Sequence, residues 1–210
     1  MKSLHNLRIA TMPARRPRIL LLNASLAGET GNTAVLFARA RRLLVRRAKV
    51  ESVTLASLSA SVSQFSALNS QLTAADGFLI GTGTHWDSWS SVLQKFLEDA
   101  TPAEGTALWL GKPAACVITE HSVGGKGVLS RLQGVLVTLG CSLPPMSGLV
   151  LSRAAVLAAQ HDPEAARDFW CADDLRIACH NLVEAASGTR RWKTWPVDRD
   201  GFADRWLSPE

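Results

Sequence analysis

An apolar run that breaks abruptly into a small polar loop constrains the fold of this chain more than any other feature. Residues 19–22 read Ile-Leu-Leu-Leu, a pattern typical of a strand that is buried on both faces. Ser25, Gly28 and Gly31 follow in the loop, and a helical pattern begins at Thr33. A strand, a polar loop and a helix in this order surround an anion with free backbone N–H groups. An ordinary connection capped by Thr or Asn explains the same residues equally well, so the stretch alone leaves both interpretations open.

The loop differs from two well-known phosphate-binding motifs. It does not end in Gly-Lys-Ser/Thr, and it does not contain Gly-x-Gly-x-x-Gly. The first absence excludes a Walker loop, and the second excludes the dinucleotide fingerprint.

Length and composition favour one soluble globular domain. A chain of 210 residues is long enough for a full core and short for two domains. With 47% hydrophobic and 20% charged residues, the balance is ordinary. No apolar run approaches the ~20 residues of a membrane helix. The run at 19–22 is also shorter than the ~7–15-residue core of a signal peptide. We therefore expect a cytoplasmic protein that has no membrane partner.

Basic residues gather in the first predicted helix and give much of the net charge of +5. They are Arg39, Arg41, Arg42, Arg46, Arg47 and Lys49. No aromatic residues alternate with them and no nucleic-acid motif is present, so we expect no nucleic-acid partner. The pattern favours a solvated helix face, with attraction of anionic substrates as the functional alternative.

The four cysteines are widely spaced and form no Cys-x-x-Cys pair. They are Cys116, Cys141, Cys171 and Cys179. This spacing favours reduced thiols over a zinc site or a thioredoxin-like motif. Each cysteine is predicted to be a small residue of the core.

Strands and helices alternate along the chain, which predicts an α/β protein with a doubly wound parallel sheet. Strands are expected over 18–23, 50–55, 77–81, 114–119 and 147–151. Helices are expected over 33–47, 90–99, 128–139 and 162–186. The Ser-rich stretch over 57–70 is expected to be a loop that could contain a short helix, and a helical turn is considered at 72–75. The strand over 50–55 alternates polar and apolar residues, as an edge strand does. Ligands bind outside the carboxyl ends of such strands, where the polar loops after the first, third and fourth strands would meet.

Several segments, in their order and spacing, resemble the flavodoxin-like NAD(P)H-dependent FMN reductases over residues 18–150. Asn23-Ala24-Ser25 and Gly31-Asn32-Thr33 are similar to that family's Gly-Ser-x-x-x-x-Gly-Asn-Thr phosphate loop. Ala-Asp-Gly-Phe-Leu-Ile-Gly at 75–81 resembles its third strand, and Trp86-x-Ser88 followed by Leu-Gln-Lys-Phe-Leu-Glu at 93–98 resembles the next segment. Gly-Lys-Pro-Ala-Ala at 111–115 and the exit at 124–125 are similar to its fourth strand and loop.

The resemblance implies a fold, a cofactor and a set of contacts. The fold would be a five-stranded sheet of order 2-1-3-4-5 with helices on both faces, within a domain over 17–188. FMN would be bound, with NADPH or NADH as reductant and free flavin, a quinone or a similar small molecule as acceptor. The phosphate would lie on Ser25, Gly31, Asn32 and Thr33. The ring would lie between Thr84, His85, Trp86, Asp87, Ser88 on one side and Thr119, Glu120, His121, Gly124, Gly125 on the other. No side chain need act as a nucleophile, because the flavin carries the hydride chemistry.

Four positions depart from the family pattern. The family usually has Pro at Gly83, Tyr near His85 and Gly at Asp87. An arginine of its first loop is replaced by Leu26 and Ala27. Gly83 makes the ring loop more flexible than a proline would, and Asp87 places a carboxylate where bare backbone is expected.

Three functional hypotheses follow. The first is an NAD(P)H oxidoreductase that works through FMN; the second is a one-electron FMN carrier, although such carriers are typically acidic. The third is a flavodoxin-like binding module with weak or no FMN binding, motivated by Gly83 and Asp87. Four side chains (His85, Asp87, Glu120 and His121) could approach one another, but their spacing does not define a metal site, so no metal is expected.

Several other residues carry functional hypotheses. His85 or His121 could donate a proton. Trp86 or Trp89 could stack on the ring or anchor a helix, and Lys126 could attract a nicotinamide cofactor's phosphate. Residues 1–16 are expected to form a loose tail. The extension over 189–210, rich in Trp, is expected to pack on a sheet edge, on a second subunit or on the site rim. The resemblance implies a homo-oligomer, either a dimer or a tetramer.

Overall fold

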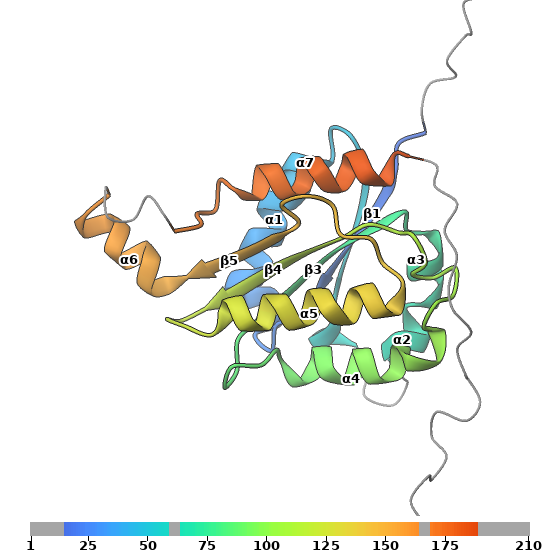
Figure 1. The fold of residues 1–210 in the computed structure, drawn as a ribbon, viewed down its shortest axis with the longest axis horizontal. Coiled ribbons are helices and arrows are strands. Elements are labelled where there is room, and N and C mark those ends of the chain that lie inside the picture. The colour runs from blue at the N-terminus through green and yellow to red at the C-terminus, as the bar shows by residue number, and fades with distance from the viewer. Residues whose placement is uncertain (1–14, 59–63, 164–168, 189–210) are drawn as a thin grey trace, which may run out of the picture.

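A five-stranded parallel sheet forms the centre of the computed structural model, which describes residues 15–58, 64–163 and 169–188 (Figure 1). The strands are β1 (Arg18–Asn23), β2 (Lys49–Thr54), β3 (Gly77–Gly83), β4 (Ala114–Glu120) and β5 (Gly148–Ser152). Their order in the sheet is β2-β1-β3-β4-β5, which confirms the flavodoxin-like fold. The strand order reverses between β1 and β3, so the loops that follow these two strands diverge there and leave a crevice.

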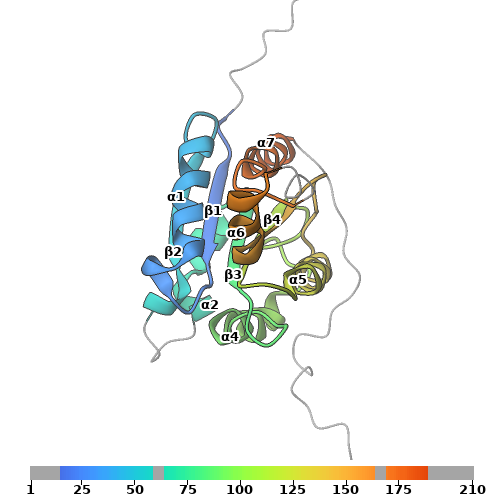
Figure 2. The same ribbon diagram turned by 90° about the vertical axis from the view of Figure 1, so that its left-hand side faces the viewer.

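Helices cover both faces of the sheet (Figure 2). One face carries α1 (Asn32–Leu44) and α7 (Leu175–Ala186), and the other carries α4 (Ser91–Ala100) and α5 (Gly125–Leu139). The short α2 (Gln64–Ala67) and α3 (Asn69–Ala74) connect β2 to β3. A further helix, α6 (Arg153–His161), follows β5 directly and projects beyond the carboxyl edge of the sheet (Figure 1).

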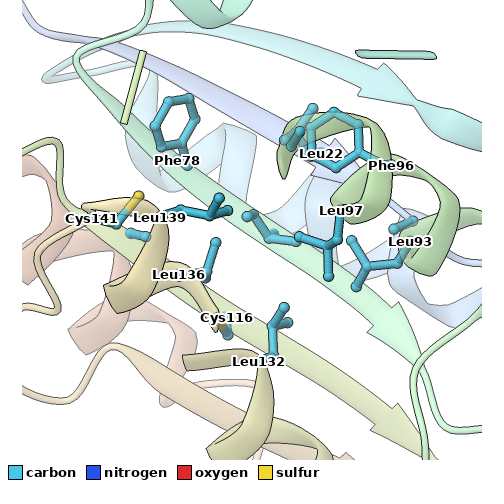
Figure 3. Packing of buried hydrophobic residues seen from close by; sticks show 14 of the residues in the cluster. Leu22, Phe78, Leu93, Phe96, Leu97, Cys116, Leu132, Leu136, Leu139 and Cys141 are labelled. Atoms are coloured by element: carbon cyan, nitrogen blue, oxygen red, sulfur yellow. The ribbon is translucent and has the colours of Figure 1, made fainter. Parts of the chain in front are cut away.

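The alternation of side chains along β1 builds two cores. Leu20 and Leu22 pack with the residues of α4 and α5, whereas Ile19 and Leu21 pack under α1 and α7. All four side chains are buried, as expected of a strand with helices on both sides. Figure 3 shows the first of these cores, where Leu22 and the leucines of α4 and α5 meet over the sheet.

The prediction of one helix over 162–186 is wrong. Asp162 has an extended backbone (φ −142°, ψ 93°) and ends α6, and Pro163 follows as a residue that cannot continue a helix. The next helix begins at Leu175, where Asp174 occupies the N-cap position and accepts a hydrogen bond from the Cys171 N–H at 2.8 Å. Asp-Pro therefore marks the end of one helix here, although the same pair is typical of helix starts.

Smaller differences concern element ends. The first helix spans Asn32–Leu44 rather than 33–47, and the fourth strand extends to Glu120. The helix expected over 128–139 begins at Gly125, three residues earlier. A short helix was considered within the Ser-rich segment and a helical turn at 72–75, and the structure has α2 at Gln64–Ala67 and α3 at Asn69–Ala74. Within the described residues, no helix is long and apolar enough to cross a membrane.

The terminal segments lie mostly outside the described residues, which include neither 1–14 nor 189–210. Of the expected N-terminal tail, only Arg15 and Arg16 are described. The Arg15 guanidinium forms an ion pair with Asp76 at 2.7 Å. The expected packing of the Trp-rich extension stays a prediction.

Three of the four cysteines are buried, and Cys171 is exposed, so the prediction that every cysteine lies in the core is wrong for Cys171. Burial raises the pKa of the Cys116 thiol, and it raises the pKa of the Cys141 and Cys179 thiols to about 12. Because the thiolate is the reactive form, these three thiols should be inert. We expect a thiol reagent at mildly alkaline pH to label the native chain at Cys171 alone. Labelling of all four should require denaturant, and rapid native labelling of Cys116 would contradict the packing.

Candidate functional site

Loops from four strands meet at the carboxyl edge of the sheet and enclose an open cavity of about 300 Å³. Its lining residues are Ser25, Ala27, Gly31, Asn32, Gly83, Thr84, His85, Thr119, Glu120, His121 and Arg153. The structure thus brings together eight of the residues that the sequence analysis proposed for the cofactor. The other six, Thr33, Trp86, Asp87, Ser88, Gly124 and Gly125, do not line this cavity.

The N-terminus of α1 forms one end of the cavity. Gly31 is the N-cap and is extended (ψ 166°), so the N–H groups of Asn32 and Thr33 open the helix. Neither N–H has a hydrogen-bond acceptor among the residues that the structure describes. A Cβ on Gly31 would lie 2.8 Å from the Ala27 Cβ and 3.1 Å from the Ser25 Oγ, so only glycine allows this close loop. Two free donors and a hydroxyl at a helix N-terminus suit a phosphate.

Side chains within the loop hold this arrangement in place. The Asn23 side chain donates to the Gly28 carbonyl at 3.0 Å and accepts from the Ser25 N–H at 3.1 Å. Gly28 has a positive φ of 53°, which closes the turn. The loop is therefore fixed by its own asparagine before any ligand binds.

Thr33 is buried beside the cavity and does not line it. Its Oγ1 lies 3.3 Å from the Oγ1 of Thr119, so the two hydroxyls share a hydrogen bond that joins α1 to β4. The contact of Thr33 with the phosphate stays a prediction; its hydroxyl is engaged with Thr119, and its N–H has no acceptor among the described residues.

Residues 85–88 form a tight hairpin above the other end of the cavity. The His85 and Ser88 backbones exchange two hydrogen bonds, of 2.8 and 3.0 Å. The two residues between them, Trp86 and Asp87, have positive φ values of 49° and 56°, as a type I′ turn requires. A positive φ is uncommon for a tryptophan. The turn leaves the Trp86 side chain fully exposed to solvent.

Two carboxylates lie at the N-terminus of α5. Glu120 accepts a hydrogen bond from the Gly125 N–H at 2.5 Å. Asp87 lies against Gly124, where a Cβ would be 2.1 Å from the Asp87 Oδ1. The negative charge of Asp87, one of the departures noted above, is thus directed at the positive end of a helix.

Arg131 fastens the hairpin to α5. It donates a hydrogen bond to the Asp87 carbonyl, and its guanidinium lies 5.6 Å from the centre of the Trp89 ring. The Trp89 indole also donates to Gln94 at 2.8 Å, so Trp89 anchors α4. Lys126, considered above for a nicotinamide phosphate, lies 4.3 Å from the centre of the Trp170 ring.

Three lining residues were missed by the sequence analysis: Ala27, Gly83 and Arg153. Arg153 is the first residue of α6 and lies 3.1 Å from the His121 ring, measured from Nη1 to Nε2. A signal for Arg153 was available, because it follows β5 directly and all carboxyl ends of a parallel sheet share one edge. Among the residues that the structure describes, no group of three His, Cys, Asp or Glu side chains could hold a metal ion.

A family model described as NADPH-dependent FMN reductase matches residues 17–155, which is more than half of the chain. The chain belongs to this family. The match spans all five strands and the three polar loops of the cavity. No curated protein matches the chain in sequence.

Solved structures share the fold at low identity. RosB with bound 8-demethyl-8-formylriboflavin-5'-phosphate has a TM-score of 0.63 and 15% identity, over 92% of this chain and 96% of that chain. The NADH:FMN oxidoreductase EmoB, in its apo form, has a TM-score of 0.61 and 18% identity, over 80% and 89%. The NAD(P)H:acceptor oxidoreductase FerB of Paracoccus denitrificans has a TM-score of 0.56 and 18% identity, over 81% and 97%. At these identities the likeness shows a common fold.

Proposed function

We propose that this protein binds FMN and uses NADPH or NADH to reduce free flavin, a quinone or a similar small acceptor. One observation carries the proposal. A single cavity joins the free N-terminus of α1 to the hairpin at His85 and to the end of β4. FMN needs these features in this order: hydrogen-bond donors for its phosphate, small residues along its ribityl chain and an open space for its flat ring.

The residues of the cavity fit FMN. The N–H groups of Asn32 and Thr33 and the Ser25 hydroxyl would hold the phosphate. The ring would lie between the 84–88 loop and the segment from Thr119 to Gly125. Bound FMN would supply the chemistry by accepting a hydride from NAD(P)H and passing it to the acceptor.

The groups around the proposed ring position would orient the flavin and tune its reduction, and none of them would act as a nucleophile. The N–H groups at the tip of the hairpin, on Trp86 and Asp87, have no hydrogen-bond acceptor within the described residues and would serve the polar edge of the ring. Ring-edge donors stabilise the negative charge that develops on reduction. His85 lines the cavity and is the better proton donor, because the His121 ring is held by Arg153.

We further propose that the protein acts as a homo-oligomer in the cytoplasm. Large apolar side chains are exposed near the carboxyl edge of the sheet, among them Trp86 and Leu157. Such side chains become buried when a second copy packs against them. The size of the oligomer would follow from light scattering of the purified protein.

The alternatives are distinguished by colour and redox behaviour. A binding module that lacks flavin is the alternative suggested by Gly83 and Asp87. The part of this motivation that rests on Asp87 is weaker in the folded chain, because Asp87 faces the end of α5 and does not line the cavity. A one-electron carrier would accumulate a semiquinone during reductive titration, and such carriers are typically acidic, unlike this chain.

The first test is a visible absorbance spectrum of the purified protein before and after FMN is added and the excess removed. We expect a bound-flavin spectrum that NADPH or NADH bleaches and that a quinone restores. A protein that stays colourless at high FMN would overturn the proposal. A flavin that binds but is never bleached by either nucleotide would overturn the reductase activity alone.

A further inference from the structure

A second cavity, of about 480 Å³, adjoins the proposed flavin cavity on the side of β5 and α6. The two cavities share four lining residues: Asn32, Thr119, Glu120 and Arg153. Cavities of this size hold small organic ligands. A molecule in the second cavity would therefore lie next to the proposed cofactor.

Five of the ten residues that line this second cavity are apolar, and we call them its apolar wall: Val35 and Leu36 from α1, Leu151 from β5, Val156 from α6, and Ala172. The other five are polar or charged: Asn32, Thr119, Glu120, Ser152 and Arg153. Val35 and Val156 are largely exposed, at 68% and 54% of their full surface, although they face a hollow rather than a flat surface. Apolar side chains that stay exposed in a concavity favour a flat apolar ligand.

Among the residues that the structure describes, Arg153 is the single cation that lines this cavity. Within the described residues it forms no ion pair, and its contact is with the His121 ring at 3.1 Å. The one acidic residue of the lining, Glu120, directs its carboxylate at the Gly125 N–H. Arg153 thus presents a charge with no carboxylate partner beside an apolar wall, as anion-binding arginines do.

We propose that the second cavity binds the electron acceptor, and that this acceptor is an aromatic molecule with one carboxylate or sulfonate group. The aromatic part would lie on Val35, Leu151 and Val156, and the anionic group on Arg153. A nicotinamide nucleotide fits less well, because its several phosphates would need more donors than one guanidinium. The assignment of the ligand as acceptor rests on the proposed function, whereas the binding chemistry does not.

The test uses a pair of probes that undergo no redox chemistry: 2-naphthoate and its neutral analogue 2-naphthamide. Calorimetry on the purified full chain should show that the wild type binds the naphthoate at least about tenfold more tightly than the amide, as a charge-assisted pair requires. Arg153→Ala should remove that preference, and Arg153→Lys should restore part of it. Arg42→Ala removes the same charge from the exposed surface of α1 and should change neither affinity. Equal binding of both probes by the wild type, or an unchanged preference in Arg153→Ala, would overturn the proposal.

A second measurement places the probe relative to the cofactor. Naphthoate should still bind when the protein is saturated with FMN, because most of the second cavity lies outside the first. Complete displacement of naphthoate by FMN would show that the two cavities are one site, and would overturn the inference. If the protein binds no FMN, the proposed function fails, but the Arg153 variants still decide whether the anion site exists.

Discussion

Replacing Asn32 with proline should weaken FMN binding by about ten- to a hundredfold and leave the fold intact. Asn32 is the first residue of α1, a position at which proline is favoured because its N–H would have no partner within the helix. Gly31 before it is extended, as a residue preceding proline must be. The substitution therefore removes one donor from the proposed phosphate site at little cost in stability. A hydrogen bond to a charged group contributes about 1.5–3 kcal/mol, which gives the expected loss.

Asn32→Ala is the matched control for this experiment. It removes the same side chain but keeps the N–H, so the difference between the two variants isolates the backbone donor. Fluorescence titration of FMN gives the affinities, and thermal unfolding without FMN checks the fold. Equal FMN affinities for Asn32→Pro and Asn32→Ala would show that the phosphate does not lie at the N-terminus of α1.

Gly81→Ala should destabilise the protein by about 2 kcal/mol, because the added methyl group has no room. Gly81 is in β3 directly under α1. A Cβ there would lie 2.6 Å from the Thr33 Cγ2 and 2.7 Å from the Phe37 Cε1, and both side chains are buried. The helix would have to shift away from the sheet, and its N-terminus would move with it. We therefore expect a lower free energy of unfolding in urea together with weaker FMN binding.

Gly83→Ala is the matched control, two residues along the same strand. A Cβ at Gly83 would lie 3.6 Å from the nearest atom, the Thr119 Oγ1, which is an ordinary contact. Its free energy of unfolding should stay within about 0.5 kcal/mol of the wild type. Similar losses at both positions would indicate that strand glycines matter here for reasons other than the packing of α1.

The strands could be predicted because a strand that is buried on both faces has an uninterrupted run of apolar residues, which is visible in the local sequence alone. Residues 19–22 are apolar without interruption because helices lie above and below β1. The helix ends were harder. Asp162 and Pro163 are equally suited to ending one helix and starting another, and the choice depends on where Leu175, Ala178 and Leu182 find a core to cover.

The cavity could be predicted in outline. Three polar loops follow parallel strands, and parallel strands end at one edge, so Ser25, His85 and Thr119 had to approach one another. Side-chain directions could not be predicted. Thr33 turns into the core to meet Thr119, and Asp87 turns toward the end of α5, because each finds its hydrogen-bonding or electrostatic partner on an element distant in the sequence.

The sequence by itself determined the sheet, the strand that begins it and the loops that gather at its carboxyl edge, because these depend on periodic burial and on the direction of the chain. Only the tertiary structure decided that a second cavity lies beside the first and that Arg153 lines both. These features arise where α1, β5 and α6 meet in space. Local sequence patterns do not predict such contacts between distant elements, because each element can form its own secondary structure without them.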